Sequence, residues 1–186
     1  FSCNSPKRTN PKTEATPVFS TYFSNNGAMY SVGYSNGLLR LFSTEDQKLL
    51  GEFKNSNAII TTSLFSKNDS FLLASSMDSA IMIYDIYNKK LAFKRKFNYQ
   101  VFSAMFFNNS LDYAVCGPNN YLRLYHYTSG NQYDSLKHSN NVVFFWFSQN
   151  DSMLASSCDD STIYVWDLYP KKLLYQLEGH KAGVKC

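Results

Sequence analysis

Three side chains in the C-terminal part of the sequence are of the types that hydrolases use. Ser156 could act as a nucleophile, His138 as its base and Asp160 as the group that orients the base. Ser156, however, lies at the end of a predicted strand and not on the sharp turn that exposes a catalytic serine. Fragments of the same set also recur along the chain at a fixed spacing, whereas catalytic groups occur once per site. We therefore interpret these residues as structural and expect no enzymatic activity.

A second group of side chains could bind phosphate. Lys94, Arg95 and Lys96 are consecutive, and basic pairs occur at 89–90 and 171–172. Such cations could form a basic rim for RNA or phosphoinositides, because they neutralise phosphate charge. The corresponding turn of the first repeat, "TEDQ", is acidic, and lysines on exposed edge strands also prevent edge-to-edge pairing. A solvated strand edge is therefore the favoured interpretation, and nucleic acid is the less favoured partner.

The composition favours strands and argues against a metal site or a cofactor. The 186 residues include 15 Phe and 14 Tyr, only 17% are charged, and the formal net charge is +4. Abundant aromatics with polar turn residues are typical of β-structure. The four cysteines form no C-x-x-C pair and the three histidines are far apart, so we expect neither metal nor cofactor. Without a long apolar run or a signal peptide, we expect an intracellular location, in the cytoplasm or the nucleus, and no transmembrane segment.

The elements that would position these side chains recur four times. The repeated segments are "LLRLFS" (38–43), "AIMIYD" (80–85), "YLRLYH" (121–126) and "TIYVWD" (162–167). Each includes a closing aromatic residue, and these aromatics are spaced by 42, 41 and 41 residues. A second aromatic lies 19 residues before each of them, and a β-branched aliphatic lies five residues earlier still. This period, with four short strands and polar turns in each unit, predicts a repeated antiparallel meander.

The fourth unit carries the motif by which a family can be recognised. The stretch "LASSCDDSTIYVWD" (154–167), followed by Gly179 and His180, resembles the WD40 repeat, whose units form the blades of a β-propeller. The resemblance extends over residues 18–186 and weakens in the first three units. It implies an all-β fold with four complete four-stranded antiparallel blades and the start of a fifth. Rings of this family most often have seven blades, so we expect part of such a ring.

The resemblance also implies a structural hydrogen-bond network. In the family, a loop His bonds to an Asp and a Ser, and the Ser bonds to an indole N–H. The matching residues here are His138, Asp160, Ser156 and Trp166. A buried network of this kind stabilises a fold when every member is satisfied.

The first three units keep only part of this network. The Asp position holds residues that can stabilise a tight turn, namely Asn36, Asp78 and Asn119. The His position holds Glu14, Ser56 and Phe97. We therefore expect one complete network, in the fourth blade, and aromatic and aliphatic packing in the others.

The expected organisation of the chain follows from the repeat. Residues 1–17 contain prolines and basic residues and are predicted to be a flexible tail or linker. The blades are predicted at about 18–53, 60–97, 101–136 and 142–177, and the next blade starts at 178–186. Because the chain begins with Phe1 and the fifth unit stops within its first strand, we expect a segment of a longer protein.

The resemblance implies a non-enzymatic protein-interaction scaffold within a multiprotein intracellular assembly. Peptides or protein domains are the expected partners, on the face formed by the loops before the first strands and the turns before the third strands. The candidate contact residues there are Tyr34, Met77, Tyr99 and Asp159. The alternative is a phosphate-binding propeller that uses Lys94, Arg95 and Lys96.

Overall fold

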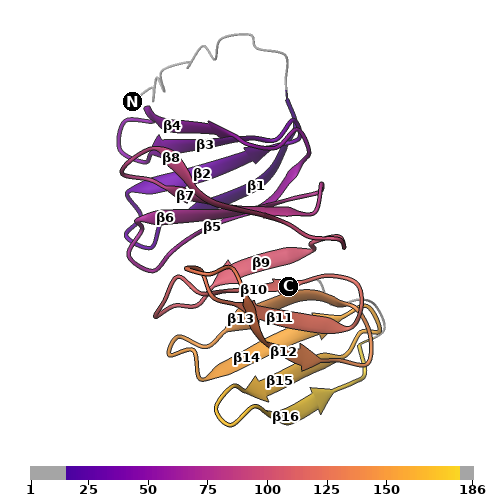
Figure 1. Cartoon of the computed structure of the whole chain (residues 1–186). Helices are drawn as coiled ribbons and strands as arrows, with labels where there is room; N and C mark the ends of the chain where they lie inside the picture. The colour runs from indigo at the N-terminus through magenta and orange to yellow at the C-terminus, as the bar shows by residue number, and fades with distance from the viewer. Residues whose placement is uncertain (1–15, 181–186) are drawn as a thin grey trace, which may run out of the picture.

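The computed structural model describes residues 16–180, and within this range the chain forms strands and no helix. Sixteen strands of this part form four antiparallel sheets of four strands, each with its strands in chain order. Figure 1 shows the sheets following one another from the indigo to the yellow end of the chain. The predicted all-β class with four four-stranded units is confirmed.

The strands are four to seven residues long, and polar turns separate them; some alternate in burial, as β8 does, and others are buried almost throughout, as β7 and β10 are. The first sheet contains β1 (Val18–Phe23), β2 (Met29–Tyr34), β3 (Leu38–Ser43) and β4 (Leu49–Lys54). The second contains β5 (Ile60–Phe65), β6 (Phe71–Ser76), β7 (Ala80–Asp85) and β8 (Lys90–Lys96). The third contains β9 (Ser103–Phe106), β10 (Tyr113–Cys116), β11 (Tyr121–Tyr125) and β12 (Gln132–Lys137). The fourth contains β13 (Val142–Phe147), β14 (Met153–Cys158), β15 (Ile163–Asp167) and β16 (Lys172–Leu177).

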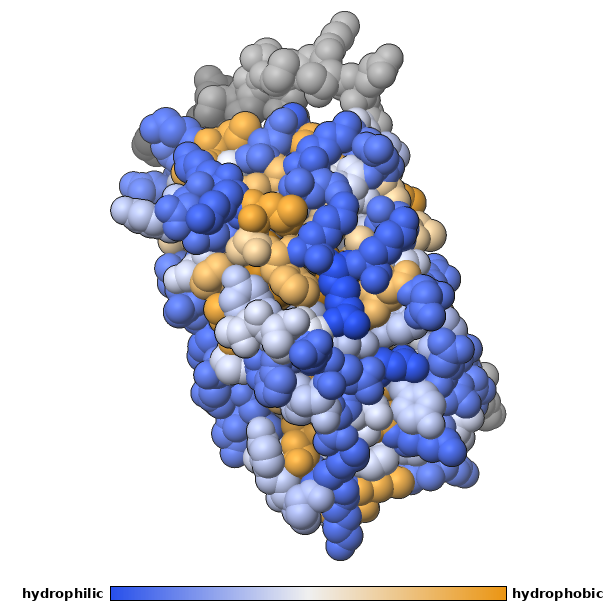
Figure 2. Space-filling model, viewed as in Figure 1, coloured by the Kyte–Doolittle hydropathy of each residue, from blue (hydrophilic) through white to orange (hydrophobic). Residues whose placement is uncertain are grey.

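A four-stranded sheet cannot bury both of its faces alone, and here consecutive sheets bury them against each other. A first core joins Leu39 and Leu41 to Ile60 and Leu72, between sheets one and two. A second joins Leu73 and Ile81 of sheet two to residues of sheet three, and a third lies mainly between sheets three and four. Hydrophilic residues cover most of the face shown in Figure 2, where hydrophobic residues reach the surface in separate areas.

One backbone feature recurs in the turns at the period of the sequence repeat. In each sheet, the first turn connects the first and second strands, the second turn connects the second and third, and the outer turn connects the third and fourth. Residues with left-handed backbone conformation occupy matching positions: 27, 69 and 151 in first turns, 37, 79, 120 and 161 in second turns, and 47, 89, 130 and 171 in outer turns. The first turn of sheet three is the exception, because Ser110 at the matching position is not left-handed. That turn therefore has a different shape from its three counterparts.

Parts of the predicted domain organisation fall outside the residues described. Most of the expected tail (1–15) and the end of the expected fifth blade (181–186) lie there. The division into tail and propeller and the closure into a seven-bladed ring stay predictions. Within residues 16–180 no helix is long and apolar enough to cross a membrane.

Candidate functional site

The structure brings His138, Ser156 and Trp166 together in the fourth sheet. Nε2 of His138 lies 2.8 Å from Oγ of Ser156, and the indole Nε1 of Trp166 donates to the same Nε2 at 3.3 Å. Nδ1 of the imidazole lies 3.1 Å from the carbonyl oxygen of Leu136. A carbonyl only accepts, so Nδ1 carries the proton and Nε2 is the acceptor for both the hydroxyl and the indole.

Two bonds differ from those that the family resemblance implied. The indole N–H bonds to His138 and not to Ser156, and Asp160 bonds to Ser139 Oγ (2.7 Å) and to the Thr162 amide (3.1 Å). The physical reason is the tautomer, because the Nδ1 proton is already donated to Leu136 and Nε2 is an acceptor. His138 therefore has no proton to offer Asp160, and Ser139 takes that role.

Burial keeps the imidazole neutral. His138 is only 4% exposed, and this burial lowers the pKa of its side chain from the ordinary 6.5 to about 4, although the Leu136 carbonyl and the Asp160 charge act in the other direction. A neutral imidazole with one donor and one acceptor is what this hydrogen-bond pattern needs. The arrangement gives Ser156 no exposed position from which to attack a substrate, since its side chain is 2% exposed.

The turn residues of the other sheets behave differently from one another. Asn36 accepts from the amide of Leu38 at 3.1 Å, as Asp160 does from Thr162. Asp78 instead accepts from the hydroxyl of Ser76. At Asn119 it is the backbone amide that is bonded, to the side chain of Asn141 at 3.1 Å. Phe97, in the loop between β8 and β9, lies edge-on to Tyr125 at 5.6 Å, much as His138 lies edge-on to Trp166 at 5.5 Å.

The four candidate partner-binding residues differ in their exposure and in their contacts. Met77 is exposed, at 47%, and Asp159 is exposed and accepts from the Asn141 side chain. Tyr34 is half-buried beneath the guanidinium of Arg40, 5.4 Å from its ring centre. Tyr99 lies in a pocket that neither Met77 nor Tyr34 lines. Their role in binding stays a prediction.

The three consecutive cations on β8 point in alternate directions, as strand geometry requires. Lys94 and Lys96 are exposed, and Lys94 donates to the carbonyl of Asn55 in the loop after β4. Arg95 is half-buried and donates to the carbonyl of Gly130 in the third sheet. The phosphate-binding role of this triplet stays a prediction, and the three side chains do not form one row of charge.

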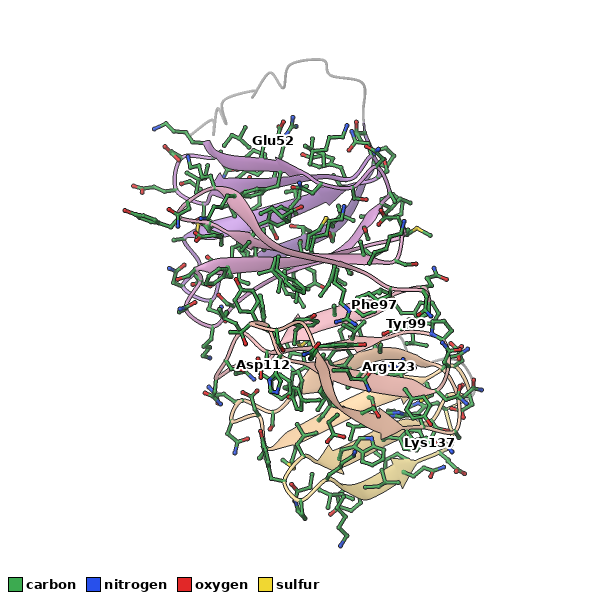
Figure 3. All side chains as sticks on the ribbon, viewed as in Figure 1. Glu52, Phe97, Tyr99, Asp112, Arg123 and Lys137 are labelled. Carbon is green, nitrogen blue, oxygen red and sulfur yellow. The ribbon has the colours of Figure 1, made fainter. Side chains whose placement is uncertain are left out.

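Arg95 and Lys96 instead line a cavity of about 500 Å³ between the second and third sheets, here called the junction pocket. Its lining residues are Arg95, Lys96, Phe97, Asn98, Tyr99, Asn119, Arg123, Tyr125 and Gln132. Figure 3 places Phe97, Tyr99 and Arg123 close together at this junction. The lining holds three cations and no carboxylate, so the pocket favours an anion.

Aromatic rings hold the two guanidinium groups of the junction pocket. Arg95 lies 4.7 Å from the ring centre of Tyr125, and Arg123 lies 4.7 Å from that of Tyr99. The hydroxyls of Tyr99 and Tyr125 are 3.2 Å apart, and Tyr125 donates to Gln132. Burial, and next the bond to Tyr125, raise the pKa of Tyr99, so its hydroxyl stays protonated. Stacking on the rings orients the flat guanidinium groups, and that of Arg95 already donates to the Gly130 carbonyl.

Arg123 is the residue of this pocket that our sequence analysis missed. Its Nη1 is buried and has no hydrogen-bond partner among the described residues. The matching residue of the first sheet, Arg40, faces Glu52 on the next strand, and Nε of Arg40 bonds to that carboxylate at 2.8 Å. Arg123 faces Ser135 at the matching position. Comparing the cross-strand positions of the repeats would have revealed an arginine whose acidic partner is replaced.

The fold and the His138 network define a class of protein, the β-propellers built from four-stranded meanders. The family model described as "WD domain, G-beta repeat" matches residues 47–85 and 130–167. These two segments of the chain therefore match the WD40 repeat. It is also 25% identical over 121 residues to "Transcription factor unc-37" of Caenorhabditis elegans, a match that covers 65% of this chain and 20% of that protein. The chain thus spans about a fifth of the length of this relative.

Proposed function

We propose that this chain is a non-enzymatic protein-interaction module that binds an acidic segment of a partner protein in the junction pocket. The observation that carries the proposal is Arg123, a guanidinium stacked between Tyr99 and Tyr121 without the carboxylate that its counterpart Arg40 has. A buried donor without an acceptor costs free energy, and a carboxylate from a partner removes that cost.

The chemistry of the pocket supports a protein ligand. Arginine forms paired hydrogen bonds with a carboxylate in one plane, and Tyr and Arg are enriched among the residues that dominate protein interfaces. The two matches to the WD40 repeat and the similarity to a protein named as a transcription factor support a scaffold role. We further propose that the module works in a multiprotein assembly inside the cell, in the nucleus or the cytoplasm.

Fluorescence anisotropy with a short labelled peptide rich in Asp and Glu tests this proposal. Arg123→Gln removes the unpaired charge and is expected to weaken binding by about tenfold, which corresponds to about 1.4 kcal/mol. Arg40→Gln is the matched control, because Arg40 occupies the same strand position in sheet one and is already paired with Glu52. Equal effects of the two substitutions would contradict the proposal.

A second pair of variants tests whether a carboxylate from within the chain can pair with Arg123 in place of the partner's carboxylate. Ser135→Glu places a carboxylate opposite Arg123, where Glu52 lies opposite Arg40, and should block the acidic peptide. Ser135→Gln, of the same size but uncharged, should bind almost as the unchanged chain does. If the chain binds an RNA oligonucleotide or phosphoinositide vesicles with steep salt dependence, and not the acidic peptide, the phosphate-binding alternative replaces this proposal.

A further inference from the structure

Two of the three junctions between consecutive sheets are closed by an aspartate in a first turn. Oδ1 and Oδ2 of Asp69 accept from the amides of Asn25 and Asn26, at 2.8 and 3.0 Å. Asp69 belongs to sheet two and the two amides to sheet one. The carboxylate therefore joins the first turns of neighbouring sheets, and we call this arrangement a carboxylate clamp.

The same clamp recurs between sheets three and four. Oδ1 and Oδ2 of Asp151 accept from the amides of Asn108 and Asn109, both at 2.8 Å. The Asn108 side chain also donates to the Ser148 carbonyl, as the Asn25 side chain donates to that of Ser66 in the first clamp. Two clamps with matching bonds show that this turn edge is built to hold a carboxylate.

The junction between sheets two and three has the donors of a clamp but no carboxylate. Lys67 and Asn68 occupy the positions of the donating pair, and their backbone amides have no hydrogen-bond partner among the described residues. Ser110 stands where Asp69 and Asp151 stand, and its turn is the one without the left-handed residue. A cavity of about 490 Å³ lies here, lined by Ser66, Lys67, Asn68, Asn108, Asn109, Ser110 and Leu111.

We propose that this cavity binds the carboxylate of an Asp or Glu side chain from a partner protein. The two amides of Lys67 and Asn68 would receive its two oxygens, as the corresponding amides do in both clamps. The Lys67 ammonium adds a positive charge that neither clamp has, since asparagine occupies that position in sheets one and three. A planar carboxylate fits adjacent amides in the way that Asp69 and Asp151 demonstrate, and this favours it over a tetrahedral phosphate.

This site is separate from the junction pocket, with which it shares no lining residue. It lies at the first turns, after β5 and β9, whereas Asn119 of the junction pocket lies in the second turn, at the other end of β10. Arg123→Gln should therefore leave it unchanged, so the two proposals can fail independently.

Amide chemical shifts of the ¹⁵N-labelled chain test the site directly. N-acetyl-aspartate amide, as probe, should shift the Lys67 and Asn68 amides, and the uncharged N-acetyl-asparagine amide should not. Ser110→Asp supplies the carboxylate from within the chain, so it should weaken probe binding by about tenfold or more and raise the melting temperature. Ser110→Asn is the matched control, because Asn allows the same turn conformation without the charge.

The outcomes are distinguishable. Shifts at Lys67 and Asn68 that disappear in Ser110→Asp and persist in Ser110→Asn support the site. No shift with the aspartate probe, or larger shifts with inorganic phosphate at the same concentration, would overturn it. A Ser110→Asp chain no more stable than Ser110→Asn would also count against a clamp position at this junction.

Discussion

The imidazole of His138 and the hydroxyl of Ser156 lie 2.8 Å apart, which joins the loop after sheet three to the second strand of sheet four. The acceptor in this pair is Nε2, and Trp166 donates to the same atom. Both donors therefore depend on one lone pair, and that lone pair exists only while the imidazole is neutral.

Acid should weaken the fold through this group. The pKa of His138 is about 4 in the folded chain and 6.5 in the unfolded chain, so between these values the unfolded chain binds more protons. Stability is complete above pH 6.5 and falls as the pH decreases to 4, by about 3 kcal/mol in total. Urea unfolding at a series of pH values measures this, and His138→Gln should lack this part of the pH dependence. Equal slopes for the two chains would refute the assignment.

Ser156→Ala and Trp166→Phe should not have additive effects. Each removes one donor to Nε2 and is expected to cost about 1 kcal/mol, while the remaining donor still satisfies the imidazole. The double variant leaves Nε2 unsatisfied in a buried position and should cost more than the sum of the two. A double-mutant cycle by chemical denaturation measures the difference, and strict additivity would show that the two donors do not share the acceptor.

The two carboxylate clamps should differ in strength. Asp151 is buried, at 5% exposure, and its four bonds come from the amides and side chains of Asn108 and Asn109. Asp69 makes its bonds at an exposed site. Asp151→Asn should cost about 2 to 3 kcal/mol and Asp69→Asn about 1 kcal/mol, because water competes less at the buried site. Thermal and urea unfolding of both variants measure these two losses of stability. A larger loss for Asp69→Asn than for Asp151→Asn would contradict the prediction.

Gly37 and Gly27 provide a test of close packing at a turn. Both have left-handed backbone, with φ of +82° and +72°. A Cβ at Gly37 would lie 2.2 Å from the Ser56 carbonyl oxygen, whereas one at Gly27 would meet nothing within 4 Å. Gly37→Ala should therefore cost about 3 kcal/mol or more, and Gly27→Ala only the backbone strain of about 1 kcal/mol. Similar melting temperatures for the two variants would contradict this difference.

The strand order and the register of the repeat could be predicted because alternation and spacing are local properties of the chain. The four closing aromatics at a period of 41 to 42 residues were enough to place every third strand. The alternation of β8 also contained the information that Arg95 faces away from Lys94 and Lys96, although three consecutive cations suggested one patch.

The contacts across sheets could not be predicted in the same way. The partner of Asp160 depends on which imidazole nitrogen carries the proton, and the Leu136 carbonyl decides this through folded geometry. The Asp69 and Asp151 clamps join turns that are more than 40 residues apart. No spacing within one repeat reveals such bonds, because they depend on how two sheets face each other.

The left-handed turn positions indicate how the chain could be made more stable. Ser79 and Ser161 hold φ of 68° and 66° at the position where sheet one has Gly37. For a residue with a Cβ this conformation costs about 1 kcal/mol of free energy, whereas glycine adopts it without that cost. Ser79→Gly and Ser161→Gly should each raise the melting temperature, which differential scanning calorimetry would measure. The repeat thus imposes the same turn conformation even where the local residue disfavours it. Each such position is therefore a site where substitution by glycine could make the chain more thermostable.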